Sequence, residues 1–114
     1  MLTIDKLLRF GTKVDEGLSR CVNDEAFYFR MISMAVEDTA FEELDQALAA
    51  EDLDAAFAAV HKLKGVLGNL ALEPLYRPAS ELTELLRHKS PGDYRGLLNT
   101  ILEQRAALRA LIED

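Results

Sequence analysis

Residues 52–70 have the sequence DLDAAFAAVHKLKGVLGNL, which contains the most regular apolar spacing in the chain. The apolar residues recur at intervals of four and three, the a/d stripe of a helix that packs in a bundle. Either Asp52 or Asp54 can cap the start of this helix. The stripe that we expect to be buried consists of Ala56, Val60, Leu63, Leu67 and Leu70.

The composition of the chain is typical of a helical protein. Among its 114 residues there are only 6 Gly and 3 Pro, while Ala, Leu and Glu are abundant, which favours helix over strand. The length allows one modest hydrophobic core and is too short for a second independent one. We therefore expect a single all-α domain over residues 1–114.

Three helical segments are expected before residue 52. Residues 5–10 fit a short helix that ends at Gly11, because glycine readily adopts the left-handed conformation that follows a helix. Residues 15–21 fit a second short helix. Residues 23–25, with the sequence Asn-Asp-Glu, then supply an N-cap and negative charge for a longer helix.

That longer helix is either continuous or broken. Thr39 and Glu42 have capping-box spacing, so a helix restart at Thr39 is a real alternative. In both cases its apolar positions are Phe27, Met31, Met34, Ala35, Phe41, Leu44 and Leu48.

Two helices are expected after residue 70. One of them contains Pro78, which removes a hydrogen bond from a helix interior, so this helix either starts near Pro78 or kinks there. Residues 90–92 form a turn, and Asp93 can cap the last helix. The apolar positions of the two helices are Leu75, Leu82, Leu85 and Leu86 in the first and Leu97, Ile101, Leu108, Leu111 and Ile112 in the second. This order of amphipathic helices predicts an antiparallel four-helix bundle with short additional N-terminal helices.

The charge of the chain narrows the class of partner. There are 13 Lys plus Arg against 20 Asp plus Glu, a formal net charge of -7, which argues against binding to nucleic acid or to an anionic membrane. A single cysteine, Cys21, excludes an internal disulfide. Residues 1–6 carry charge before any apolar signal segment, and no long uncharged apolar run follows. We expect a cytoplasmic protein whose partner is another protein.

His61 is predicted to face away from the apolar stripe, because each helical residue turns the chain by roughly 100°. Its neighbours on the outer face are Lys64, Gly65 and Gly68, with Phe57 and Ala58 one turn earlier. Each glycine costs about 1 kcal/mol relative to alanine in a helix interior. We interpret the two glycines as lowering the surface around the imidazole for a partner's active site, and Phe57 as a docking contact. Ala58 and Lys62 are expected to belong to the same surface for partner access and docking.

The alternative interpretation makes Gly65 the end of the helix. Lys62 and Lys64 would then interact with the carbonyl end of the helix dipole. Against this, Val66, Leu67 and Leu70 keep the apolar register of Val60 and Leu63.

Charge placement supports an anion at His61. Lys62 and Lys64 are the only Lys or Arg residues between Met31 and Tyr76. An exposed imidazole is largely neutral near neutral pH and then offers a nucleophilic ring nitrogen. Lys64 is placed to pair with a phosphate. The alternative is an ordinary surface histidine beside two incidental lysines.

His61-Lys62-Leu63-Lys64-Gly65 resembles the His-x-Leu-Lys-Gly signature of histidine-containing phosphotransfer (HPt) domains. Gly68-Asn69-Leu70 is similar to the Gly-Asn-Ile that often follows in that family. The resemblance implies that His61 is phosphorylated, that Lys64 helps to hold the phosphoryl group, and that Gly65 opens access for the partner. Gly68 matches a common small position of the family.

Two positions depart from the family pattern. Many members have glycine where this chain has Ala71. Many also have Glu or Gln on the facing helix to orient the imidazole, where a simple count reaches Thr83. If Pro78 shifts the alignment, Ser80 or Glu84 would come closer to the site.

The resemblance implies a phosphocarrier that has no enzymatic activity or cofactor of its own. It would accept phosphate from the aspartyl phosphate of a response-regulator receiver domain, which brings Mg²⁺, and would pass it to another receiver. A hybrid sensor kinase is a further expected partner. The chain has no glycine-rich phosphate loop, so autonomous kinase activity is not expected. We expect a monomer, because one helix face must stay free for transient docking.

Two other classes of function are alternatives to phosphotransfer. Metal-binding bundles use spacings such as Glu-x-x-His, which this sequence lacks, so no metal site is predicted. An interaction module that binds a receiver or kinase domain without accepting phosphate is the stronger alternative, and it differs from a phosphocarrier only in the chemistry of His61.

Overall fold

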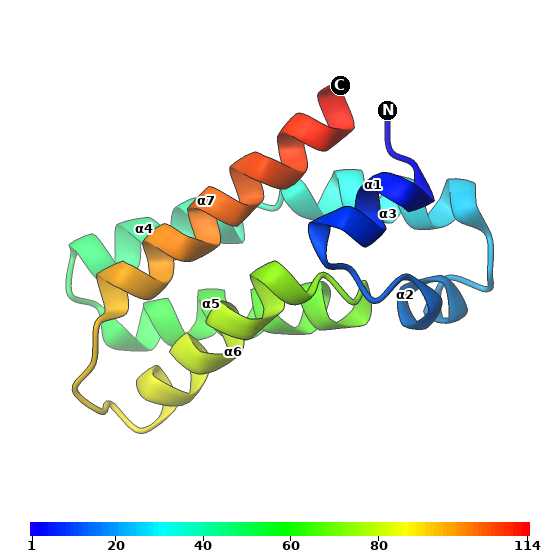
Figure 1. Cartoon of the computed structure of the whole chain (residues 1–114). Coiled ribbons are helices and arrows are strands. Elements are labelled where there is room, and N and C mark those ends of the chain that lie inside the picture. The colour runs from blue at the N-terminus through cyan, green and yellow to red at the C-terminus, as the bar shows by residue number, and fades with distance from the viewer.

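The computed structural model describes residues 1–114 and contains seven α-helices and no strand. The expected all-α class is therefore confirmed (Figure 1). The helices are α1 Ile4–Phe10, α2 Val14–Arg20, α3 Glu25–Val36, α4 Ala40–Ala49, α5 Leu53–Asn69, α6 Glu73–Arg87 and α7 Tyr94–Glu113. None of them combines the length and the apolar composition that crossing a bilayer requires.

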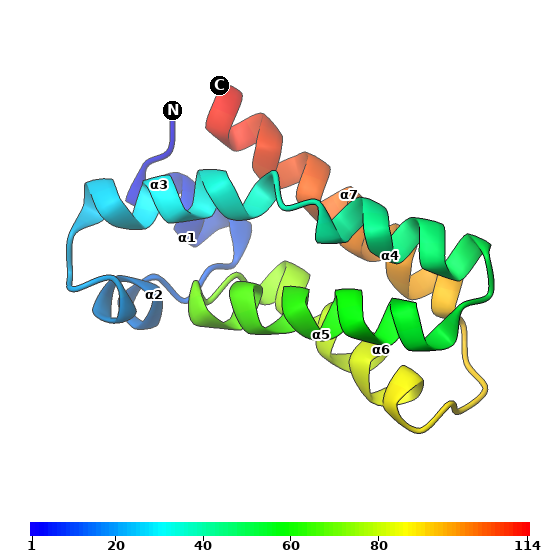
Figure 2. The same ribbon diagram turned by 180° about the vertical axis from the view of Figure 1, so that it is seen from behind.

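Helices α4 to α7 form the expected antiparallel four-helix bundle. The most extensive packing is of α5 against α6 and α4, followed by α6 against α7. Helix α3 follows the same edge of the molecule as α4, and α1 and α2 lie at one end of the bundle (Figure 2). The amino group of Met1 donates a hydrogen bond to the carbonyl of Asp114, so the chain ends lie together.

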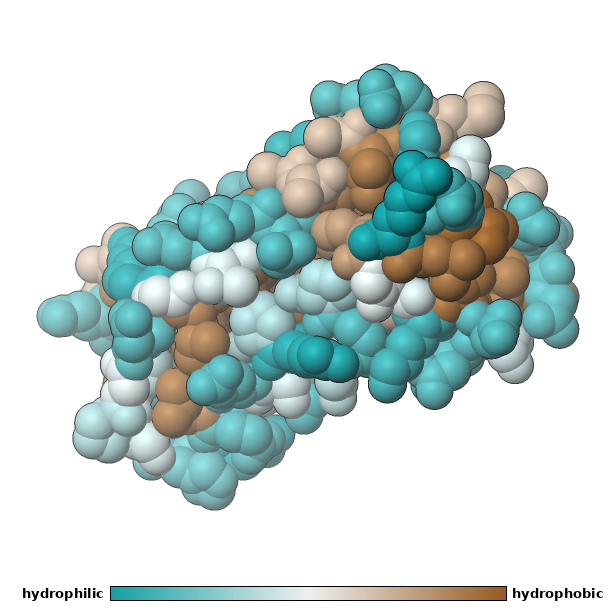
Figure 3. All heavy atoms as spheres, in the orientation of Figure 1, coloured by the Kyte–Doolittle hydropathy of each residue, from teal (hydrophilic) through white to brown (hydrophobic).

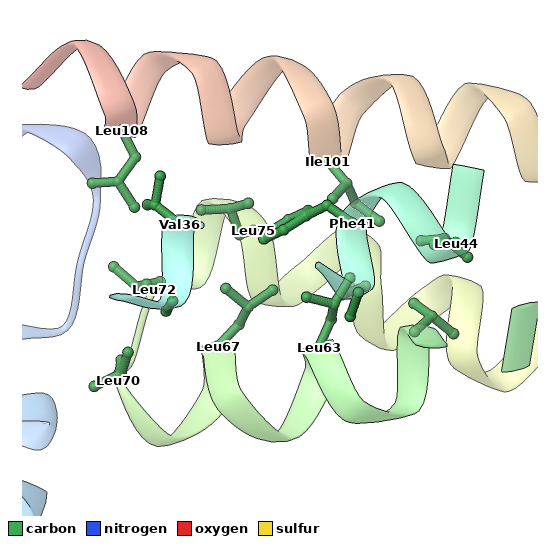
Figure 4. Packing of buried hydrophobic residues seen from close by; sticks show 14 of the residues in the cluster. Val36, Phe41, Leu44, Leu63, Leu67, Leu70, Leu72, Leu75, Ile101 and Leu108 are labelled. Atoms are coloured by element: carbon green, nitrogen blue, oxygen red, sulfur yellow. The ribbon is translucent and has the colours of Figure 1, made fainter. Parts of the chain in front are cut away.

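The apolar stripe of α5 anchors this arrangement. All five of its predicted residues are buried within one cluster of 27 buried hydrophobic residues. Figure 4 shows Leu63 and Leu67 pointing from α5 toward Phe41 and Leu75, with Ile101 entering from α7. Full burial of a leucine side chain stabilises the fold by roughly 1.5–3 kcal/mol. The rotational setting of α5 is therefore strongly fixed.

Capping side chains define most of the helix starts. The backbone N–H groups of α1, α3, α5 and α7 are capped by the side chains of Thr3, Asp24, Asp52 and Asp93. Asp52, and not Asp54, is thus the cap of α5. Gly11 ends α1 as predicted, with a left-handed φ of 104°.

The chain breaks between α3 and α4, so the predicted restart near Thr39 is confirmed. The predicted capping box of Thr39 and Glu42 is wrong, however, because the Thr39 side chain caps no backbone N–H. Thr39 already has a helical backbone and its hydroxyl donates to the Glu43 carboxylate at 3.0 Å. The Ala40 N–H is satisfied instead by the Asp38 carboxylate at 2.8 Å. Asp38 therefore takes the role that spacing had assigned to Thr39.

Helix α6 does not start near Pro78, which corrects one of the two alternatives. It starts at Glu73, and Pro78 lies in its interior. Pro74 occupies the first turn, where a missing N–H costs nothing because that group has no partner within the helix. The start of α6 is thus set by Pro74, four residues earlier than Pro78.

Helix α7 buries part of the predicted stripe, and the rest of that stripe packs against the core. Leu98, Ile101, Arg105 and Leu108 are buried, whereas the predicted Leu97, Leu111 and Ile112 are only partly buried. Arg105 is an interior residue that an apolar pattern does not recognise.

Arg105 ties the break between α3 and α4 to α7. Its Nε donates to the Val36 carbonyl at 2.7 Å, and its Nη1 donates to Glu42 Oε1 at 2.9 Å. The guanidinium also lies 4.4 Å from the centroid of the Phe41 ring. The hydrogen bond from Arg105 lowers the pKa of the Glu42 carboxyl. This contribution to stability is therefore present above the ordinary pKa of Glu42 and is lost as the pH falls through the lowered pKa.

Replacing Arg105 with Met should lower the free energy of unfolding by about 2 kcal/mol at neutral pH, because the change removes two hydrogen bonds of a charged group. Urea unfolding measures this loss. Arg109→Met is the matched control, since Arg109 forms a more exposed ion pair with Glu37, and its loss should stay below about 1 kcal/mol. The cost of Arg105→Met should shrink in acid. Equal losses for the two variants would contradict the structural role of Arg105.

The face of the bundle seen in Figure 1 is mostly hydrophilic. Figure 3 shows hydrophobic residues in separate patches, with a large patch near the N-terminal helices. Leu8 of α1 and Met34 of α3 are among the exposed large hydrophobic residues.

Candidate functional site

His61 lies on the exposed face of α5, opposite the buried stripe. The helix continues through Gly65 and Gly68 and ends at Asn69. The alternative in which Gly65 ends the helix is therefore wrong. Both glycines lie inside an intact helix that carries the imidazole.

Three helices surround a shallow hollow of about 530 Å³ beside the imidazole. From α5, its lining includes His61, Lys64, Gly65 and Gly68, four of the residues that the sequence had grouped together. Helices α2 and α6 supply further side chains, so the hollow joins parts of the chain that are distant in sequence. Its remaining lining residues are Glu16, Arg20, Asn69, Glu73 and Tyr76.

The two glycines of the hollow have different surroundings. A Cβ at Gly65 would meet no other atom within 4 Å, so the surface beside His61 is open there. A Cβ at Gly68 would lie 2.8 Å from Cε1 of Tyr76. Gly68 thus lets the Tyr76 ring pack closely against α5, which gives a packing reason for a residue that we had interpreted as opening access.

Lys64 is within reach of the hollow and is only weakly engaged. Its side chain is 28% exposed, and its Nζ lies 4.0 Å from Glu84 Oε1. Glu84 also pairs with Arg87 at 3.3 Å and lies 3.7 Å from His88. Ion pairs of this length near the surface contribute little to the free energy of folding. The ammonium group of Lys64 can therefore leave Glu84 at small cost when an anion occupies the hollow.

Ala58 and Lys62 lie on the other side of the exposed face. They line a second hollow that faces α4, and the Lys62 ammonium pairs with Asp38 at 3.4 Å. The structure thus divides the predicted group of residues: Lys64 lines the hollow with His61, while Ala58 and Lys62 flank it on the side of α4.

Phe57 is the aromatic neighbour of the imidazole. The rings of Phe57 and His61 are stacked, with centroids 5.4 Å apart and an interplanar angle of 15°. Arg87 of α6 lies over the Phe57 ring at 5.1 Å. Aromatic pairs of this kind stabilise a fold by about 0.5–1.5 kcal/mol. Phe57 therefore holds the imidazole plane, a contact that its predicted docking role did not include.

Thr83 is not an orienting partner of His61, which corrects that candidate assignment. Its side chain is fully buried and its hydroxyl donates to the Ala79 carbonyl at 2.7 Å. It belongs to the core face of α6 and not to the face that meets the hollow. Of the two alternatives, Glu84 interacts with Lys64, and Ser80 is only partly exposed.

Ala71, where many HPt domains have glycine, has a φ of 59°. Glycine adopts this left-handed conformation without steric cost, whereas alanine pays roughly 1–2 kcal/mol for it. The backbone after α5 thus keeps the conformation that favours glycine although the residue differs.

Sequence reasoning missed several residues of the site. Tyr76 lines the hollow and lies four residues before Ser80 on α6, and that spacing predicts that the two residues share one helix face. Arg20 has no such signal, because its contacts with α5 span 48 and 49 positions.

The fold and the site together define a class of protein, a helical bundle domain that bears an exposed histidine. The bundle is antiparallel, a lysine lies one turn from the histidine, and the surface between the helices is open. A family model described as Hpt domain matches residues 34–114, well over half of the chain, so this protein belongs to the Hpt domain family. Hpt domains are phosphotransfer modules of two-component systems and carry phosphate without being enzymes. The match begins near the end of α3, so α1 and α2 lie outside it. Searches for similar curated proteins and similar solved structures found no match.

The surroundings of the two glycines predict opposite effects of alanine. Gly65→Ala should raise the free energy of unfolding by up to about 1 kcal/mol, because alanine favours helix and meets no neighbour. Gly68→Ala should be about 1–3 kcal/mol less stable than Gly65→Ala, because its Cβ overlaps the Tyr76 ring. Thermal and urea unfolding of the two variants make the comparison. Equal stabilities would show that Tyr76 does not restrict position 68.

Proposed function

We propose that His61 accepts a phosphoryl group from the aspartyl phosphate of a receiver domain and passes it to the aspartate of another receiver. The observation that carries this proposal is the exposed imidazole at the edge of a hollow that Gly65 leaves open and to which Lys64 contributes a positive charge. Membership of the Hpt domain family supports it. In this role the protein acts as a cytoplasmic monomer, with response regulators and a hybrid sensor kinase as partners.

The transfer step needs no proton from a third group. The unprotonated ring nitrogen of His61 attacks the phosphorus in line, and a N–P bond forms as the bond between phosphorus and the aspartyl oxygen breaks. The aspartate leaves as a carboxylate, and the other ring nitrogen keeps its proton. Transfer to the next receiver reverses these bond changes.

Each of the residues around His61 has a separate role in this step. Phe57 fixes the plane of the imidazole, Lys64 moves from Glu84 to the phosphoryl oxygens, and Gly65 leaves room for the receiver's active site. Ala58 and Lys62 contact the receiver on the side of α4. The receiver supplies the Mg²⁺ that neutralises charge during transfer, so this chain needs only to position its histidine.

The phosphorylation site is tested with a phosphorylated receiver and radioactive phosphate. Wild-type protein should acquire label that is stable in alkali and labile in acid, as expected for a phosphohistidine. His61→Gln should acquire none. His88→Gln is the matched control, since His88 is the other histidine and is also exposed, and it should be labelled like the wild type.

Two outcomes of this labelling experiment would count against the proposal. Label on His88 would place the chemistry at the wrong histidine. If the wild type stays unlabelled with several receivers but binds one of them, the chain is an interaction module that does not carry phosphate.

The access role of Gly65 predicts that Gly65→Gln folds normally but transfers phosphate about tenfold more slowly, equivalent to about 1.4 kcal/mol in the barrier. The added side chain would fill the open surface beside His61. Rapid-quench measurement of phosphate transfer from a receiver gives the rate. Ala106→Gln adds the same side chain at an exposed position of α7 and should leave the rate unchanged. An unaltered rate in Gly65→Gln would exclude the steric argument.

A further inference from the structure

Arg20 of α2 is a cation without a carboxylate partner. Of the 13 Lys and Arg side chains, all but three pair with a carboxylate within 4.0 Å. Of those three, Lys6 donates to backbone carbonyls near the chain ends and Arg30 lies over the Phe27 ring. Arg20 is the one that lines the hollow beside His61.

The guanidinium of Arg20 is anchored but not neutralised. Its Nη1 donates to the carbonyl of Gly68 at 2.6 Å and, more weakly, to that of Asn69 at 3.4 Å. Both acceptors are uncharged, so the positive charge remains. A guanidinium has five N–H donors in a rigid fork, and the remaining ones are free to bind an anion bidentately.

Helix α2 is held in place by packing that involves the end of α5. Tyr28 of α3 is buried, and its hydroxyl donates to the Leu70 carbonyl at 2.7 Å. Burial is the main cause that raises the pKa of Tyr28 to about 12. Gly17 of α2 lies against this hydroxyl so closely that a Cβ there would overlap it. The packing of α2 against Tyr28 therefore fixes the position of Arg20 at the hollow.

Lys64 alone does not neutralise a phosphoryl group in the hollow, so a second cation would stabilise it. A phosphoryl group carries about two negative charges at neutral pH, and Lys64 alone supplies one positive charge. Glu73 is engaged by Arg77 at 3.2 Å and Lys13 at 3.8 Å. Glu16 is the carboxylate of the hollow that has no ion pair, and it opposes an anion.

We infer that Arg20 is a second cation for the phosphoryl group on His61, supplied by a helix outside the matched family range. This inference rests on the proposed function. His61 and Gly68 are two helical turns apart, about 10 Å along α5. His61 and Arg20 both line the hollow that spans this distance. Gly65, between them, has no side chain to keep them apart.

The test is the equilibrium of phosphate transfer between this protein and a purified receiver with Mg²⁺. Because the equilibrium between separated proteins depends only on their free and phosphorylated forms, a residue that merely helps docking changes the rate and leaves the equilibrium unaltered. Arg20→Gln should reduce the equilibrium constant for phosphate on His61 about five- to tenfold, the loss of a charge-assisted hydrogen bond pair. Arg20→Lys should give an intermediate value.

Two further variants serve as controls. Arg30→Gln removes the other exposed arginine that lacks a carboxylate partner, away from the hollow, and should leave the equilibrium unchanged. Glu16→Gln removes an opposing charge and should shift phosphate toward His61. Thermal unfolding of each variant separates these effects from loss of structure.

The outcomes distinguish this inference from the proposed function. If the wild type is phosphorylated on His61 and Arg20→Gln has the same transfer equilibrium, Arg20 has only a structural or docking role, and the inference is overturned while the proposed function stands. If the wild type accepts no phosphate, both are overturned.

Discussion

The burial of Leu63 and Leu67 in the bundle core is the constraint on which the rest of the structure depends. These two side chains are almost completely buried, and they set the rotation of α5 about its own axis. Turning the helix by a single residue, roughly 100°, would expose leucine and bring His61 toward the core. The chemistry of the outer face is thus a consequence of the packing of the inner face.

The outer face combines groups that a solvated helix does not need. Gly65 gives up helix stability with no packing in return, whereas Gly68 is required by the ring of Tyr76. The Phe57 ring stacks on the His61 imidazole and holds it, and the Arg87 guanidinium lies over the Phe57 ring. The N-terminal helices then close one side of the hollow with Arg20. The site is therefore built from three helices around one fixed histidine, although the recognisable motif lies in α5 alone.

The sequence predicted the bundle well where one signal acted alone. The stripe of α5, a cap within residues 23–25 and the capping aspartate Asp93 are local features, and the structure confirms them. The errors occurred where two signals competed. Asp38 capped α4 in preference to Thr39, and Pro74 set the start of α6 in preference to Pro78.

The candidate site was predictable only as far as one helix extends. Spacing along α5 brought His61, Lys64 and Gly65 together correctly. Counting along α6 chose Thr83, which lies in the core, because a position count does not give the rotation of a helix behind two prolines. Arg105 and Arg20 make their contacts across the fold, with partners that no local pattern connects to them. Such contacts depend on how helices dock and are visible only in three dimensions.

We propose that a receiver domain binds to the outer face of α5. An NMR titration of isotope-labelled protein with a receiver held in its phosphorylated state tests this most directly. The largest chemical-shift changes should fall on residues 57–68 and on the walls of the hollow in α2 and α6. Changes concentrated on the exposed side of α7, with the amides around His61 unaffected, would contradict it.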